Sequence, residues 1–141
     1  MMQSLPQPEQ TIDMLLATTK QRLAHLLRLH ALWRFGLLAS IAAILFLATT
    51  AGPLPVPSAS NDKVNHLIAF LELTLLVRLG WPGLKPLYFI PLLLGFGMLI
   101  EIVQASLPYR EFSLADVAAD AAGIATGMLI WPWLKKFSTL H

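Results

Sequence analysis

The sequence predicts an all-α, polytopic membrane protein in which a cytoplasmic, N-terminal amphipathic helix precedes four transmembrane helices. The first observation behind this prediction is composition: 56% of the 141 residues are hydrophobic and only 13% are charged, whereas about 25% are charged in an average soluble domain. The second is that apolar residues gather in four long stretches, separated by segments containing proline, glycine or charged residues. A soluble fold of this size would expose too much apolar surface, so lipid must form part of its solvent.

The N-terminal segment divides into a tail and an amphipathic helix. Residues 1–8 are polar and contain proline, which is typical of an unstructured tail. From about Glu9 to Arg34, leucine and isoleucine recur at spacings of three and four residues, the pattern of one apolar helix face. This segment also carries four basic side chains, namely Lys20, Arg22, Arg28 and Arg34. A basic amphipathic helix usually lies in the plane of the lipid head groups; packing on a partner protein is the alternative.

The four predicted spans have lengths close to the ~20 residues that cross a bilayer as a helix. They cover about Trp33–Ala51, Val64–Leu79, Leu87–Leu107 and Leu114–Leu134. More than thirty residues precede the first span, too many for the charged start of a signal peptide, so we expect a retained anchor. The predicted organisation has three parts: 1–34 as tail and surface helix, 35–134 as the transmembrane domain, and 135–141 as a cytoplasmic tail.

The distribution of basic residues predicts the orientation. One side of the predicted membrane domain has eight of them, and these are Lys20, Arg22, Arg28, Arg34, Arg78, Lys85, Lys135 and Lys136. The other side has only Lys63 and Arg110. Because basic residues in short loops stay on the cytoplasmic side, both termini are expected in the cytoplasm. The loops 52–63 and 108–113 are then expected to face outward.

Eight polar residues at the outward side form a predicted site, which we call the polar cluster. They are Asp62, Lys63, His66, Glu101, Gln104, Arg110, Asp116 and Asp120. Spacings of three or four residues place the members from each span on one helix face. Ionisable groups at membrane depth are costly and usually functional. We expect Arg110 to pair with Glu101 or Asp116, and His66 with Asp120 or Glu101, in one connected network.

Several of these polar residues also have a purely structural interpretation. Asp62 is expected to cap the second span. Ser113 and Asp116 form S-x-x-D, which resembles a capping box. Glu72 either pairs with Arg78, six residues further on, or joins the buried network.

A stripe of small residues runs along the fourth span at four-residue spacing. It contains Ala115, Ala119, Gly123 and Gly127. Small residues let two membrane helices approach closely, so this face is predicted to be a helix-packing surface.

Three motifs resemble the VanZ-like membrane proteins. They are D-K-x-x-H from Asp62, E-x-x-Q followed by P-x-R from Glu101, and S-L-x-D-x-x-x-D-x-x-G from Ser113. The resemblance covers about residues 62–127 and implies a multi-pass protein of the bacterial cytoplasmic membrane, close to envelope chemistry. The family is named after a member linked to resistance to the glycopeptide teicoplanin. Its members more often carry asparagine where this chain has Asp120.

Three functional hypotheses remain open. The favoured one is a binding module for an envelope lipid head group or a glycopeptide-related ligand, with Lys63 and Arg110 holding a phosphate or carboxylate. The second is an enzyme acting on a lipid head group, with His66 and Glu101 as acid and base and a divalent metal on His66, Glu101, Asp116 and Asp120. The third is a structural protein whose salt-bridged core sets helix assembly.

The sequence also limits the chemistry of the protein. The chain has no cysteine, which excludes disulfides and thiolate ligands or nucleophiles. Its formal net charge of +2 gives no indication of a nucleic-acid partner, and membrane lipids are the expected partners. No nucleophile motif is present, so no catalytic residue is assigned and no resident cofactor is expected.

Overall fold

The computed structural model describes residues 8–50 and 62–138, and every regular element within them is an α-helix. The helices are α1 (Pro8–Leu27), α2 (His30–Thr49), α3 (Asp62–Gly80), α4 (Pro86–Ala105) and α5 (Leu114–Ser138). The all-α prediction is therefore confirmed over this part of the chain. The predicted tail 1–7, most of the proline-rich loop before α3, and residues 139–141 lie outside it.

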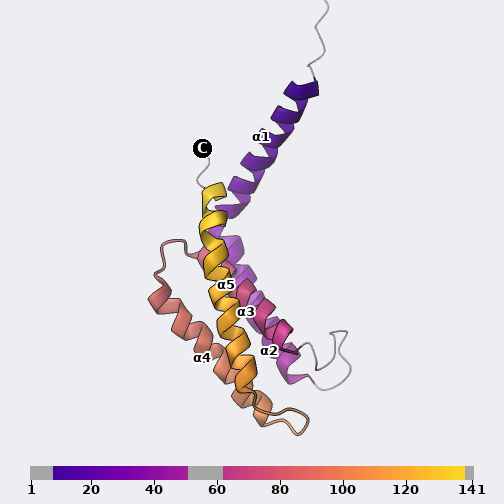
Figure 1. Ribbon diagram of the computed structural model, residues 1–141, viewed down its shortest axis with the longest axis vertical. Coiled ribbons are helices and arrows are strands. Elements are labelled where there is room, and N and C mark those ends of the chain that lie inside the picture. Colours follow the sequence, from indigo (N-terminus) through magenta and orange to yellow (C-terminus); the bar gives the residue numbers. More distant parts are fainter. Residues whose placement is uncertain (1–7, 51–61, 139–141) are drawn as a thin grey trace, which may run out of the picture.

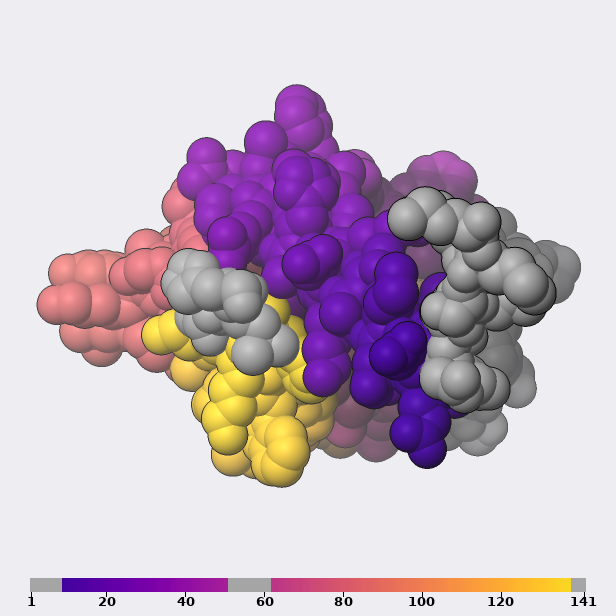
Figure 2. All heavy atoms as spheres, turned by 90° about the horizontal axis from the view of Figure 1, so that it is seen from above, coloured from indigo at the N-terminus to yellow at the C-terminus, as the bar shows by residue number. Residues whose placement is uncertain are grey.

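Helices α2 to α5 form a bundle, and α1 extends beyond one end of it (Figure 1). The start of α2 meets the end of α3, because His30 Nδ1 donates to the Leu79 carbonyl at 2.8 Å and Arg34 Nε donates to the Gly80 carbonyl at 3.0 Å. The starts of α3 and α5 meet at the opposite end, so these two helices run parallel. Viewed along the long axis, α1 lies beside the end of α5, and the start of α4 projects to one side (Figure 2).

Within the described residues, three helices rather than the expected four are long and apolar enough to cross a membrane: α2, α4 and α5. The expectation of a fourth such span over Val64–Leu79 is wrong, because α3 is too polar. It carries four charged side chains, namely Asp62, Lys63, Glu72 and Arg78. α3 can carry these charges because it lies inside the bundle. Leu73 and Thr74 of α3 are fully buried, whereas α2 has no buried residue. Among the polar side chains of α3, His66 contacts α5 and Glu72 contacts α2, whereas the Lys63 side chain is 63% exposed.

The apolar core lies between α3, α4 and α5. In α3, Phe70, Leu73 and Val77 recur at three- and four-residue spacing and form one buried stripe. The other members of this core are Phe89, Leu93, Ile100 and Ile124. Partly buried side chains of α2 cover it from one side.

The closest helix contact joins α3 to α5 through the predicted small-residue face. A Cβ atom at Gly123 would collide with the backbone carbonyl of Leu67, and one at Gly127 would collide with the side chain of Thr74. Both glycines therefore let the two backbones approach each other, as in other membrane helix pairs. Ala115, at the start of the same stripe, is exposed.

The predicted N-terminal helix from Glu9 to Arg34 is wrong in its end point, because the structure has two helices there. Arg28 and Leu29 form a turn, in which the backbone N–H of His30 donates to the Arg28 carbonyl at 2.9 Å. The side chains that follow this turn bind other elements: Trp33 Nε1 donates to the Leu26 carbonyl at 3.0 Å. The break depends on these tertiary contacts, and neither glycine nor proline marks it in the sequence.

Candidate functional site

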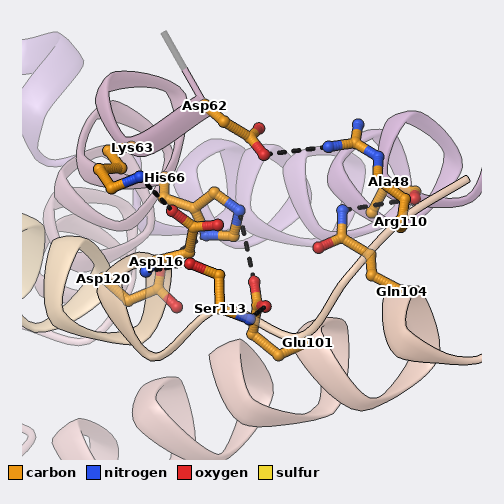
Figure 3. Close-up of polar contacts among 10 residues, drawn as sticks. All are labelled: Ala48, Asp62, Lys63, His66, Glu101, Gln104, Arg110, Ser113, Asp116 and Asp120. Carbon is orange, nitrogen blue, oxygen red and sulfur yellow. Dashed lines mark hydrogen bonds and ion pairs between the residues drawn. The ribbon is translucent and has the colours of Figure 1, made fainter. Parts of the chain in front are cut away.

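Three helices and one connection bring the polar cluster to one end of the bundle (Figure 3). The first turns of α3 supply Asp62, Lys63 and His66, and the first turns of α5 supply Asp116 and Asp120. The last turns of α4 supply Glu101 and Gln104, and Arg110 comes from the α4–α5 connection. Because α3 and α5 run parallel, their N-terminal turns lie at the same depth as the C-terminal turns of α4.

His66 lies at the centre of the cluster and is only 8% exposed. Its Nδ1 atom lies 2.8 Å from Asp120 Oδ1, and its Nε2 atom lies 3.7 Å from Glu101 Oε1. Both carboxylates are fully buried. The imidazole thus bridges α4 and α5, and in its doubly protonated form each ring N–H would face a carboxylate oxygen.

Glu101 also holds the start of α5. Its Oε2 atom accepts the backbone N–H of Ser113 at 2.8 Å, and the hydroxyl oxygen of Ser113 accepts the backbone N–H of Asp116 at 3.3 Å. The second contact is half of the expected capping box. In a complete capping box the Asp116 carboxylate would accept the backbone N–H of Ser113. Glu101 of α4 accepts that N–H instead, so the Asp116 carboxylate is available to the cluster.

The cationic side chains lie at the rim of the cluster and contact carboxylates. Arg110 Nη1 binds Asp62 Oδ2 at 3.0 Å, and Lys63 Nζ lies 4.0 Å from Asp116 Oδ1. The expected pairing of Arg110 with Glu101 or Asp116 is therefore wrong. Glu101 is occupied by Ser113 and His66, whereas Asp62 lies in the first turn of α3 and projects toward the α4–α5 connection.

Gln104 points away from His66 and toward α2. Its Nε2 atom donates to the carbonyl of Ala48 at 3.5 Å, and Tyr109 in the following connection donates its hydroxyl to the carbonyl of Thr49 at 3.1 Å. These contacts attach the end of α2 to the end of α4. The expectation of one connected network is thus wrong for Gln104, which belongs to a helix-packing contact.

Glu72 joins neither Arg78 nor the polar cluster. It accepts a hydrogen bond from the Ser40 hydroxyl at 2.8 Å, which links α3 to α2. Arg78 instead donates to the carbonyl of Leu84 at 2.9 Å and stacks over the Trp131 ring.

Gly97 is a member of the site that sequence reasoning missed. A Cβ atom there would collide with the carboxylate of Asp120 and lie close to the Phe70 ring. The absence of a side chain at Gly97 therefore lets Asp120 enter the space between α3 and α4 and reach His66. The signal in the sequence was a glycine one helical turn before Glu101, on the same face of α4.

Three buried carboxylate oxygens of the cluster have no hydrogen-bond partner among the described residues. They are Glu101 Oε1, Asp116 Oδ1 and Asp120 Oδ2. Buried polar atoms are usually satisfied, and an unsatisfied one calls for an explanation such as a catalytic role or a water or ion bound there. All three atoms are acceptors, so the site is suited to a group that donates hydrogen bonds or carries positive charge.

A second feature is compatible with a metal ion. Asp62, His66 and Asp116 each offer one ligand atom within 4.8 Å of the other two. This set differs from the expected one, since Asp62 takes the place of Glu101 and Asp120. One imidazole and two carboxylates form a donor set suited to a divalent transition metal such as zinc.

A protein-family model described as VanZ/LLP1 matches residues 2–135. The match takes in the whole polar cluster and also extends over α1 and α2, beyond the motif-bearing segment 62–127. No curated protein and no solved structure matches the chain.

Proposed function

This chain belongs to the VanZ/LLP1 family, and we propose that its polar cluster binds the head group of an envelope lipid at the outer side of the bacterial cytoplasmic membrane. The head group would donate hydrogen bonds through an amine or hydroxyl groups. A glycopeptide-related ligand carries the same kinds of donor, so the proposal includes a role in glycopeptide resistance through capture of such a ligand.

The observation that carries this proposal is the set of buried carboxylate oxygens that accept no hydrogen bond. Glu101, Asp116 and Asp120 each leave one such oxygen among the described residues, although Glu101 Oε1 lies 3.7 Å from His66 Nε2 and Asp116 Oδ1 lies 4.0 Å from Lys63 Nζ. The cations at the rim already contact carboxylates. A donor-rich head group therefore fits the interior of the cluster better than the phosphate or carboxylate that the sequence suggested for Lys63 and Arg110.

The proposed orientation has both termini in the cytoplasm and α3 as a fourth, inner helix at membrane depth. The basic residues around the α1–α2 turn, the α3–α4 connection and the end of α5 lie at one end of the bundle, opposite the polar cluster. Such a bias usually marks the cytoplasmic side. Neighbouring helices bury His66, Leu73 and Thr74 of α3, which offsets the cost of polar side chains on that face.

An enzyme is the second candidate function, and the grouping of Asp62, His66 and Asp116 favours it. A divalent metal held there would lower the pKa of a bound water and so supply the nucleophile that the sequence lacks. A purely structural role has less support, because a self-sufficient core would leave fewer buried acceptors unpaired.

The binding proposal is tested with purified protein in nanodiscs that contain either phosphatidylethanolamine or phosphatidylcholine. These lipids differ in the three N–H donors of the ammonium group, which choline replaces with methyl groups. We expect phosphatidylethanolamine to be retained preferentially in native mass spectrometry and to raise the unfolding temperature. Equal retention of the two lipids would contradict an amine-binding site and direct the search to sugar hydroxyls.

The matched variants for this experiment are Glu101→Gln and Glu111→Gln. Glutamine at 101 keeps an oxygen for the Ser113 N–H but places an NH₂ group where Glu101 offers an acceptor. Glu111 is an exposed carboxylate in the same connection. We expect only Glu101→Gln to abolish the lipid preference. Zinc binding that is lost in Asp116→Asn would instead support the metal-dependent candidate.

A further inference from the structure

A pocket of about 230 Å³ opens at the end of the bundle opposite the polar cluster, between α1, α3 and α5. We infer that this basic pocket, defined by Arg28, His30, Trp131 and Lys135, binds the phosphate group of an anionic lipid. The inference is independent of the ligand proposed for the polar cluster, since the two sites share no residue.

The ionisable side chains that line the basic pocket are all basic. Arg28 comes from the turn after α1, His30 from the start of α2 and Lys135 from the last turns of α5. No aspartate or glutamate lines the pocket among the residues that the structure describes. The polar cluster, in contrast, contains four carboxylates. Three segments distant in the sequence therefore converge to form an anion-attracting site.

Trp131 supplies the second, independent observation. It is only 6% exposed, it lines the pocket, and its indole Nε1 has no hydrogen-bond acceptor within the described part of the chain. The N–H group of a buried tryptophan usually finds an acceptor. A phosphate oxygen would provide one, because phosphate offers acceptors only.

Arg78 adds positive charge behind the indole ring. Its guanidinium carbon lies 4.9 Å from the centroid of the Trp131 ring and 5.9 Å from that of Phe89. Its Nε atom also lacks a partner among the described residues. A cation on one face of the indole polarises the ring and favours an anion at the N–H edge.

The apolar walls of the pocket favour a lipid over a free anion. Leu27, Leu79 and Leu134 line it together with Pro82, and all three leucines pack with Trp131 in a small apolar cluster. An acyl chain would continue along this surface while the phosphate meets the cations. Basic pockets between membrane helices bind anionic head groups in this way, and the cytoplasmic leaflet is the anionic one.

The test uses the full chain in phosphatidylcholine nanodiscs, titrated with short-chain phosphatidylglycerol and, separately, with inorganic phosphate. The pocket variant is Arg28→Gln/Lys135→Gln. The control is Lys85→Gln/Lys136→Gln, which removes the same charge from exposed positions outside the pocket. We expect the pocket variant to weaken phosphatidylglycerol binding by about tenfold or more, as the loss of charge-assisted hydrogen bonds implies, and the control to change it by less than about twofold.

Trp131→Phe provides a second variant that retains an aromatic ring beside Arg78 and removes only the N–H donor. A several-fold loss of affinity with an unchanged unfolding temperature supports the inference. Equal losses in the pocket variant and the control would overturn it in favour of diffuse surface attraction. Inorganic phosphate that binds as tightly as phosphatidylglycerol would overturn the assignment to lipid, and no measurable binding of either would overturn the site.

Discussion

The carboxylate of Glu101, near the end of α4, accepts the backbone N–H of Ser113, the residue that precedes α5, at 2.8 Å. One buried side chain thus caps the next helix in the chain. The same carboxylate faces His66 through its other oxygen. Because this contact determines where α5 begins, it also positions Asp116 and Asp120, which project from the first two turns of α5. Capping and site geometry therefore depend on the same residue.

Replacing Glu101 with alanine is expected to lower the free energy of unfolding by about 2 kcal/mol, because it removes a cap and leaves the partly buried N–H of Ser113 unsatisfied. Glu101→Gln is expected to cost less than half as much, since its amide oxygen can still accept from Ser113. Chemical unfolding in detergent measures both values. Glu111→Ala, at an exposed position in the same connection, is the control. Equal costs for the alanine and glutamine variants would show that the cap contributes little.

Two Gly→Ala substitutions, one inside the α3–α5 contact and one on α4 outside it, are expected to differ in their effect on stability. At Gly123 the new methyl group would collide with the Leu67 carbonyl, and we expect a loss of about 1–3 kcal/mol, as for other overpacked sites. At Gly95 no atom beyond the adjoining residues and backbone of α4 lies within 4 Å of the new Cβ, so we expect no loss or a gain of up to about 1 kcal/mol from helix propensity. Thermal unfolding of both variants tests this. A Gly123→Ala protein as stable as the parent would contradict the close helix approach.

The orientation can be tested directly because the chain contains no cysteine. We introduce Ser58→Cys, which lies outside the described residues, and Ser138→Cys, at the end of α5. With both termini in the cytoplasm, a membrane-impermeant thiol reagent applied to intact cells should label position 58 only. Both positions should react after the membrane is permeabilised. Labelling of position 138 alone in intact cells would reverse the orientation and place the polar cluster inside.

The N-terminal helix is expected to be dispensable for membrane insertion, and the structure indicates where a truncation should end. Removing residues 1–21 deletes the exposed part of α1, whereas removing residues 1–30 also deletes Leu27, which packs with Leu79 and Trp131, and His30, which binds the Leu79 carbonyl. We therefore expect the shorter truncation to keep the parent unfolding temperature and the longer one to lower it. The comparison is made in the same detergent. Failure of the shorter form to insert would show that all of α1 is integral.

The sequence alone determined the helical class of the protein and the helix face of each polar residue. Long apolar stretches predict α2, α4 and α5, because each such helix satisfies its backbone hydrogen bonds internally and turns apolar side chains to lipid. Spacings of four residues likewise placed Asp116 and Asp120 on one face of α5. These properties depend only on periodicity within one segment, and periodicity is visible in a linear sequence.

Only the tertiary structure decided which residues meet across helices. Arg110 binds Asp62 instead of Glu101, Gln104 turns to α2, and α3 becomes the inner helix despite its charges. These outcomes depend on how far each helix is rotated and shifted against its neighbours, which glycines such as Gly97 and Gly123 control by admitting a side chain or a backbone. Rotation and shift arise from packing between segments that are distant in the sequence, so no local pattern records them.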